Sequence, residues 1–405
     1  METRLMIASL RRFAQNLVVS ASDADDTAAA SRKMLVQAGL ALATLIGLVG
    51  ARVCLVNYAS TDYDNFLSPW FDAIAAAPWR HALTHSQANY FPPYLYLIFF
   101  VSRLPLAKLV GLKLICWMGD AFLGYSVFRV ARAAGQNPRP ALFLTATVLA
   151  VPTVLFDSAM WCQTDAIYCG LLLLALAAGS LGRGWSACAF FASALAFKMQ
   201  AVFFAPVLVL LLCMGRLRLA QLTVIPLVHF AWMLPSLVLG ASLTDTYGTF
   251  VTQANFYHQL QMNAPSLYQF IPQIAYEEQS GAGIFMALAV IALALLHATS
   301  MPSTGHNTLF AWSSFFVMLV PFVLPKMHDR YFFVANVFSI VLACVVRRPS
   351  AALAAVLCNL GSLIAYAPFL FRNTPVPLAF ASFAMLCALA QTWWLARTLS
   401  LEATS

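Results

Sequence analysis

The chain has 405 residues, of which 61% are hydrophobic and only 9% charged, and its mean hydropathy is +0.79. A soluble domain has about half of its residues apolar and about a quarter charged, so this composition excludes one. The net charge of +8 comes from loop arginines and not from a basic run with stacking aromatics, which excludes a nucleic-acid surface. Continuous apolar runs of about 17 to 24 residues predict an all-α, polytopic membrane bundle and not a β-barrel.

The N-terminal part predicts a tail, a first span and a long outer loop. Residues 1–33 are polar and predict a cytoplasmic tail, because basic residues precede span 1 at Met34–Val56. The first outer loop then covers residues 57–105. Its aromatic segment Phe91–Ser102 predicts a helix at the membrane interface, with tyrosines at headgroup depth. A short second span is the alternative, but it would place the next arginines outside, against the charge rule.

The next three spans alternate across the membrane. Span 2 covers roughly Leu106–Phe128, and the arginines after it mark the cytoplasmic side. Span 3, about Ala141–Phe156, returns outward and ends in a polar stretch, Pro152–Asp165, which we interpret as an island on the outer face. Span 4 follows to about Leu181.

Residues 185–212 are too long for one ordinary span. Two short helices with a turn at Lys198–Gln200 fit this segment best, and a single tilted helix is the alternative. A second long outer loop, residues 241–280, is polar and aromatic, and loops of this length usually carry function. We interpret residues 34–240 as a catalytic transmembrane module and 281–405 as a C-terminal one, with about twelve spans in all and both termini inside.

Carboxylates and isolated cations share the expected outer face. The acids assigned to it are nine of the 15 in the chain: Asp62, Asp64, Asp72, Asp157, Asp165, Asp245, Glu277, Glu278 and Asp329. The cations assigned to it include Lys198, Lys326, Arg330 and Arg372. Charges at a membrane face are costly unless they function, so this distribution predicts a reaction centre for an anionic lipid headgroup.

Six short motifs occur in a specific order: Asp62-Tyr63, Phe91–Pro93, Lys113 with Asp120, Trp161–Asp165, Phe197–Gln200 and His328–Tyr331. In this order and spacing the chain resembles the GT-C membrane glycosyltransferases that use a polyprenyl-phosphate sugar. It looks most like bacterial relatives of the PIG-V-type mannosyltransferases, and more distantly like dolichyl-phosphate-glucose glucosyltransferases. Two positions depart from the family pattern: Cys162 replaces a usual Gly, and Asp329 a usual Glu.

The resemblance implies a role for each motif. Asp62 holds the position of the family's general base, and Asp64 is the alternative, either positioning the acceptor or tuning Asp62. The candidates for binding the donor phosphate are Lys198, Lys326, His328 and Arg330. The candidates for binding sugar or acceptor are Trp161, Gln163, Asp165, Gln200 and Tyr331. For Trp161, anchoring at the membrane interface is the other interpretation.

The implied reaction is transfer of a hexose with inversion at the anomeric carbon, from the polyprenyl-phosphate donor to a lipid-linked or cell-envelope glycan. The sequence has no Gly-rich phosphate loop, so no nucleotide is expected. The acids could bind a divalent metal, but neither they nor the nine cysteines have ligand spacing, so no cofactor is predicted. We expect a bacterial inner-membrane protein with its site facing the periplasm. A secondary transporter and a lipid-glycan flippase or ligase are the competing hypotheses.

Overall fold

The computed structural model describes residues 36, 39–84, 88–271, 276–301 and 305–402. The chain divides into two compact units, Met1–Cys54 and Leu55–Ser405. In the first unit, the apolar helix Gly39–Cys54 forms within the predicted span 1. The predicted cytoplasmic tail, residues 1–33, lies outside the described residues.

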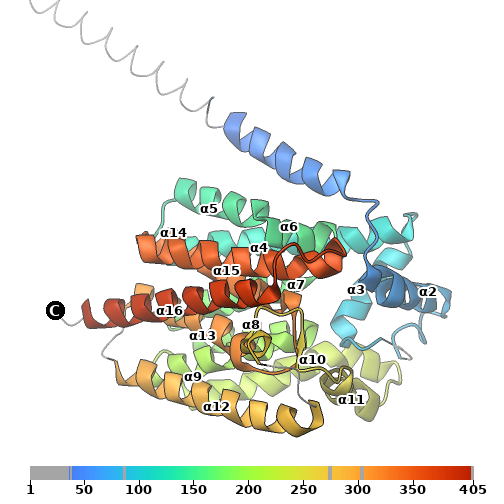
Figure 1. Cartoon of the computed structure of the whole chain (residues 1–405). Helices are drawn as coiled ribbons and strands as arrows, with labels where there is room; N and C mark the ends of the chain where they lie inside the picture. Colours follow the sequence, from blue (N-terminus) through green and yellow to red (C-terminus); the bar gives the residue numbers. More distant parts are fainter. Residues whose placement is uncertain (1–35, 37–38, 85–87, 272–275, 302–304, 403–405) are drawn as a thin grey trace, which may run out of the picture. The chain divides into compact units, whose positions relative to one another are not determined.

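The second unit is built almost entirely of helices, and Figure 1 shows its long helices packed side by side. In chain order its elements are η1 (Tyr63–Leu67), α2 (Ser68–Ala76), α3 (Pro92–Ser102), α4 (Lys108–Ala133), α5 (Pro138–Ala150), α6 (Pro152–Ala159), α7 (Asp165–Ser180), α8 (Gly184–Phe197), η2 (Met199–Phe204), α9 (Ala205–Cys213), η3 (Leu219–Thr223), α10 (Val224–Val238), α11 (Leu243–Asn255), β1 (Gln261–Met262), η4 (Leu267–Gln269), α12 (Tyr276–Ser300), α13 (His306–Val323), β2 (Met327–His328), η5 (Asp329–Phe332), α14 (Phe333–Val346), α15 (Pro349–Leu370) and α16 (Leu378–Glu402).

Helices that are long and apolar enough to cross a membrane dominate the described part of the chain. Seven meet this criterion by length and composition, and the number rises to eight if the bent pair α5–α6 is one span. Shorter apolar helices occur as well, among them α7, α8 and the segment Met199–Cys213. The predicted all-α polytopic membrane fold is confirmed, whereas the count of twelve spans stays a prediction.

The segment 185–212 forms two helices that are separated at Lys198, as predicted. Helix α8 ends at Phe197, Lys198 adopts an extended conformation (φ −153°, ψ 130°), and the chain then continues through η2 into α9. The alternative of a single tilted helix is therefore wrong. Because the break interrupts the helix in an apolar segment, it carries the charged end of Lys198 toward other polar groups.

Span 3 is not continuous, which corrects the prediction of one helix over 141–156. Helices α5 and α6 are bent by 58° at Val151, which adopts an extended conformation (φ −62°, ψ 133°). Pro152 causes the break, because proline disfavours helical geometry at the preceding residue. The expected polar island is also corrected: Pro152–Ala159 is helical, and Asp157 is buried within the protein.

The predicted helix after Phe91 forms as α3, but it is embedded in protein. Pro92 and Pro93 occupy its first turn, where proline is favoured because the amide hydrogens there need no helical partner. The helix packs on α2, α4, α8 and α10, and Tyr94 is buried. Tyr94 thus packs inside the protein, and the expectation that the tyrosines of this helix lie at headgroup depth stays a prediction.

Helix α7 lies in the core and holds the C-terminal end of the polar segment that precedes it. Every residue of α7 except Ile167 is buried, and the helix packs against α4 and α8. A Cβ atom at Gly170 would lie only 2.9 Å from the ring of Phe122 on α4, so glycine permits this close approach. Since α7 begins at Asp165, its rigid packing holds the polar residues 161–165 in place.

Candidate active site

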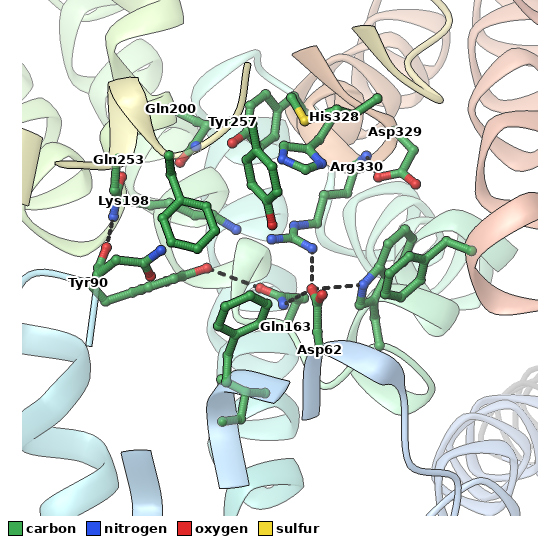
Figure 2. Close-up of a pocket in the computed structure, with 18 of the residues that line it drawn as sticks. Asp62, Tyr90, Gln163, Lys198, Gln200, Gln253, Tyr257, His328, Asp329 and Arg330 are labelled. Atoms are coloured by element: carbon green, nitrogen blue, oxygen red, sulfur yellow. Dashed lines mark hydrogen bonds and ion pairs between the residues drawn. The ribbon is translucent and has the colours of Figure 1, made fainter. Parts of the chain in front are cut away.

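A cavity of about 310 Å³ lies beside η1, α2 and α11 (Figure 2). This size is at the lower end of the range for small-molecule sites. Segments that are far apart in the sequence line it: Asp62, Phe66, Leu67, Trp70, Asn89, Tyr90, Trp161, Gln163, Lys198, Gln200, Gln253, Phe256, Tyr257, Gln259, Met262, Asn263, His328, Asp329, Arg330, Tyr331 and Phe369.

Asp62 is the hub of the polar contacts in this cavity. It immediately precedes the π-helical turn η1, and one of its oxygens, Oδ2, accepts three hydrogen bonds. Trp161 Nε1 donates at 3.1 Å and Gln163 Nε2 at 2.9 Å, and Arg330 Nη1 forms a salt bridge with the same oxygen (Figure 2). The side chains of Asp62 and Arg330 are each 14% exposed. Three donors from two distant segments therefore fix this carboxylate at the cavity wall.

A second ion pair lies deeper, between Lys198 and Asp165. Lys198 Nζ donates to Asp165 Oδ1, and the two side chains are 6% and 1% exposed. The ammonium also lies 5.9 Å from the ring centre of Tyr90 and 5.7 Å from that of Tyr168. Lys198 lines the cavity, whereas Asp165 lies behind it as its partner. The cation is thus held at the cavity by a buried carboxylate and two aromatic rings.

The segment around His328 is held by residues 260–262. Strands β1 and β2 pair in parallel, with Met262 opposite His328, and the backbone N–H of Lys326 donates to Leu260 O at 2.7 Å. The imidazole of His328 packs edge-on against Tyr257. Burial, together with the nearby cations Arg330 and Lys198, lowers the pKa of His328 to about 3. His328 is therefore neutral at neutral pH and acts as a polar, uncharged wall.

Comparison with known proteins shows what the chain is similar to. Residues 31–214 match the family model described as Alpha-(1->6)-mannopyranosyltransferase, N-terminal domain. The crystal structure of ArnT from Cupriavidus metallidurans bound to undecaprenyl phosphate superposes with a TM-score of 0.54 at 15% identity, over 90% of this chain and 78% of ArnT. The apo form of ArnT gives the same TM-score at 14% identity, over 89% and 78% of the two chains. No curated protein matches the sequence.

The chain therefore has the fold of ArnT, and its residues 31–214, less than half of the chain, are similar to a mannopyranosyltransferase domain. The structural likeness shows the fold, and the partial match to the family model supports the enzyme class that is proposed below.

Trp161 is a buried support for Asp62. Its side chain is fully buried and stacks on Phe369, with ring centres 4.5 Å apart and an angle of 13° between the planes. The guanidinium carbon of Arg330 lies 5.6 Å from the same ring. The predicted role as an interface anchor does not fit this burial. The indole N–H instead orients the carboxylate of Asp62.

Cys162, which stands where the family that the chain resembles usually has glycine, adopts a backbone conformation that favours glycine. Cys162 has φ +64°, a left-handed conformation that glycine adopts without the steric cost that a side chain brings. A glycine would adopt this conformation without steric cost, whereas Cys162 adopts it with a side chain that is disfavoured there. Its sulfur lies 4.0 Å from that of Cys116 on α4, so the side chain packs into the core.

The cavity brings together most of the side chains singled out from the sequence. Those that line it are Asp62, Trp161, Gln163, Lys198, Gln200, His328, Arg330 and Tyr331. Asp64 is exposed and does not line the cavity, and neither does Lys326, which contributes its backbone to the pairing with residue 260. No group of three or more His, Cys, Asp or Glu side chains is arranged for a metal within the described ranges.

The sequence did not reveal the amide and aromatic side chains on the wall opposite Asp62. Tyr90 O–H donates to Gln163 Oε1 at 3.2 Å, and Gln253 donates to the backbone oxygen of Asn89 (Figure 2). Tyr257 lies beside them on the second outer loop. For the part of this wall that comes from residues 241–280, the polar and aromatic composition of that segment was the signal, and it does not single out residues.

Proposed function

We propose that this enzyme transfers a hexose from a polyprenyl-phosphate-linked donor to a lipid-linked or cell-envelope glycan acceptor. The reaction takes place at the periplasmic face of the bacterial inner membrane and inverts the anomeric carbon. The mannopyranosyltransferase description of the family model supports a hexose donor. The undecaprenyl phosphate bound to ArnT supports a polyprenyl-phosphate lipid. The contact between Asp62 and Arg330 carries the proposal, because it joins a base and a phosphate-binding group in one cavity.

Arg330 and Lys198 are the proposed ligands of the donor phosphate. Both side chains line the cavity, and among the described residues Arg330 Nε has no hydrogen-bond partner. A guanidinium has five N–H donors, so Arg330 can bind phosphate while it keeps its bond to Asp62. As the bond between sugar and phosphate breaks, the phosphodiester becomes a monoester and gains negative charge. The two cations stabilise that charge.

Asp62 is the proposed general base. Its three hydrogen bonds all involve Oδ2, and no described residue donates to Oδ1, which leaves that oxygen to accept a proton. The acceptor hydroxyl attacks the anomeric carbon from the side opposite the phosphate and gives its proton to Asp62. One bond to the anomeric carbon forms while the other breaks, so the configuration inverts.

The remaining lining suits uncharged sugar rings. Carboxamides recur around the cavity: Asn89, Gln163, Gln200, Gln253, Gln259 and Asn263. An amide offers both donors and acceptors, which match sugar hydroxyls. The aromatic rings of Trp70, Tyr90 and Tyr257 also line the cavity and supply its apolar surface. We assign the donor sugar to the side of Gln163 and Gln200.

The pair of variants Asp62→Asn and Asp64→Asn tests the base. Asparagine keeps the size of aspartate but cannot accept a proton at neutral pH. We expect Asp62→Asn to lower turnover by about 10²- to 10⁴-fold while the protein still binds the donor lipid. Asp64→Asn is the matched control and should lose much less, because Asp64 is exposed outside the cavity.

The measurement is a donor screen with purified protein and short-chain polyprenyl-phosphate hexoses, followed by kinetics at saturating acceptor. Near-normal turnover of Asp62→Asn would remove the central residue of the proposal. A larger loss in Asp64→Asn than in Asp62→Asn would reassign the base.

A further inference from the structure

Helix α4 carries a buried polar stripe made of Lys113, Cys116 and Asp120. Residues at this spacing fall on one face of a helix, and the three side chains are 0%, 0% and 3% exposed. The mechanism proposed above uses none of them. Burying an ammonium and a carboxylate is unfavourable unless their hydrogen bonds are satisfied, so their contacts indicate what they do.

Lys113 binds the backbone of two separate segments. Its Nζ donates to Leu55 O at 2.5 Å, to Tyr58 O at 2.7 Å and to Ala159 O at 2.7 Å. An ammonium has three N–H donors, so every donor of Lys113 is used. The lysine therefore connects the chain before Asp62 to the end of α6.

These two segments carry the carboxylate and its supports. Tyr58 leads directly into Asp62, and Ala159 leads into Trp161 and Gln163, the side chains that donate to Asp62. A neighbouring hydrogen bond links the same two segments directly, because Ser60 Oγ donates to Trp161 O at 2.9 Å.

Asp120 completes the stripe from the other end. Its Oδ2 accepts a hydrogen bond from Ser158 Oγ at 2.6 Å, so α4 holds two consecutive residues at the end of α6. Cys116 packs between these two contacts, against Cys162. The stripe thus binds the segment that continues into Trp161 and Gln163 at three places.

We propose that Lys113 is a positioning residue, which sets the place of Asp62 relative to Trp161 and Gln163 by binding both segments at once. The proposal rests on the proposed role of Asp62 as the base. Lys113 itself lies behind the cavity wall and touches neither substrate. Its removal leaves the cations of the cavity in place, so donor binding persists while the base loses its alignment with the acceptor hydroxyl.

The test is Lys113→Met, which keeps the length and apolar stem of the side chain but removes all three donors. A misplacement of about 1 Å lowers turnover by about a hundredfold, so we expect kcat to fall tenfold to a hundredfold with the donor KM changed less than twofold. Lys108→Met is the matched control, because Lys108 lies on the same helix and pairs with exposed Asp72 at 2.5 Å. It should keep the wild-type kcat.

A double-variant cycle separates positioning from mere stabilisation. If Lys113 acts through Asp62, Lys113→Met added to Asp62→Asn lowers kcat no further. Lys113→Gln, which restores an amide N–H₂, should recover part of the lost turnover. A loss that multiplies with that of Asp62→Asn, or an unchanged kcat in folded Lys113→Met, would overturn the proposal.

Three combinations of results distinguish the positioning role of Lys113 from the proposed role of Asp62. If neither Lys113→Met nor Lys113→Gln yields folded protein that binds donor, the lysine is required for the fold itself and the proposal is wrong. If Asp62→Asn is fully active, the proposed base is wrong whatever Lys113 does. An impaired Asp62→Asn beside a normal Lys113→Met rejects only the positioning role.

Discussion

Replacing Arg330 by alanine tests the phosphate site most directly. The Arg330 side chain is 14% exposed, lines the cavity and is paired with Asp62, and its buried Nε has no hydrogen-bond partner among the described residues. Loss of a charged hydrogen bond of this kind costs about 2–4 kcal/mol, which corresponds to about 30- to 1,000-fold in kcat/KM for the donor. We expect donor affinity and turnover to fall together, because the same charge binds the phosphate and stabilises the leaving group.

The assay is initial-rate kinetics with a short-chain polyprenyl-phosphate hexose, together with direct titration of the donor lipid. Arg330→Lys keeps the charge but has fewer donors in another geometry, so it should recover only part of the loss. Arg372→Ala is the matched control, because Arg372 is exposed and does not line the cavity. Unchanged donor affinity in both Arg330→Ala and Lys198→Ala would refute the phosphate assignment.

Two further predictions concern stability. Gly361→Ala should destabilise the fold by about 1–3 kcal/mol, since its Cβ would lie 2.8 Å from the backbone oxygen of Ala381 on the facing helix. Thermal unfolding in detergent measures this, and Gly281→Ala, which has open space around it, should be neutral or stabilising. For His328, the folded pKa of about 3 lies below the unfolded value of 6.5. The unfolded chain therefore binds the proton first, and stability falls as pH drops from about 6.5 toward 3. His328→Asn should lose less stability than the wild type over this range, and an equal loss would contradict the assignment.

The fold class and the polar motifs were accessible from the sequence because they depend on local composition. Apolar runs of membrane length predict helices regardless of the tertiary structure around them. The break at Lys198 was also local, since a charged residue interrupts an apolar stretch there. The break at Val151 had an equally local cause in Pro152, but the prediction placed that proline within the span.

Only the tertiary structure decided which of the motif residues act together. Asp62 and Arg330 are far apart in the chain, and their contact depends on how η1 and η5 pack around the same cavity. The resemblance already favoured Asp62 over Asp64, and the tertiary structure adds a physical reason, because neighbouring residues on a turn point in different directions and only Asp62 lines the cavity.

The sequence by itself determined an all-α membrane fold with a set of polar motifs in a recognisable order. It could not determine the amide and aromatic wall around Tyr257, because Gln, Asn and Tyr are common in any outer loop. Nor could it give Lys113 a role, since the partners of that lysine are backbone oxygens, which every residue possesses. Contacts to the backbone leave no pattern in the side chains of the partner, so only the packing of α4 against the two segments reveals them.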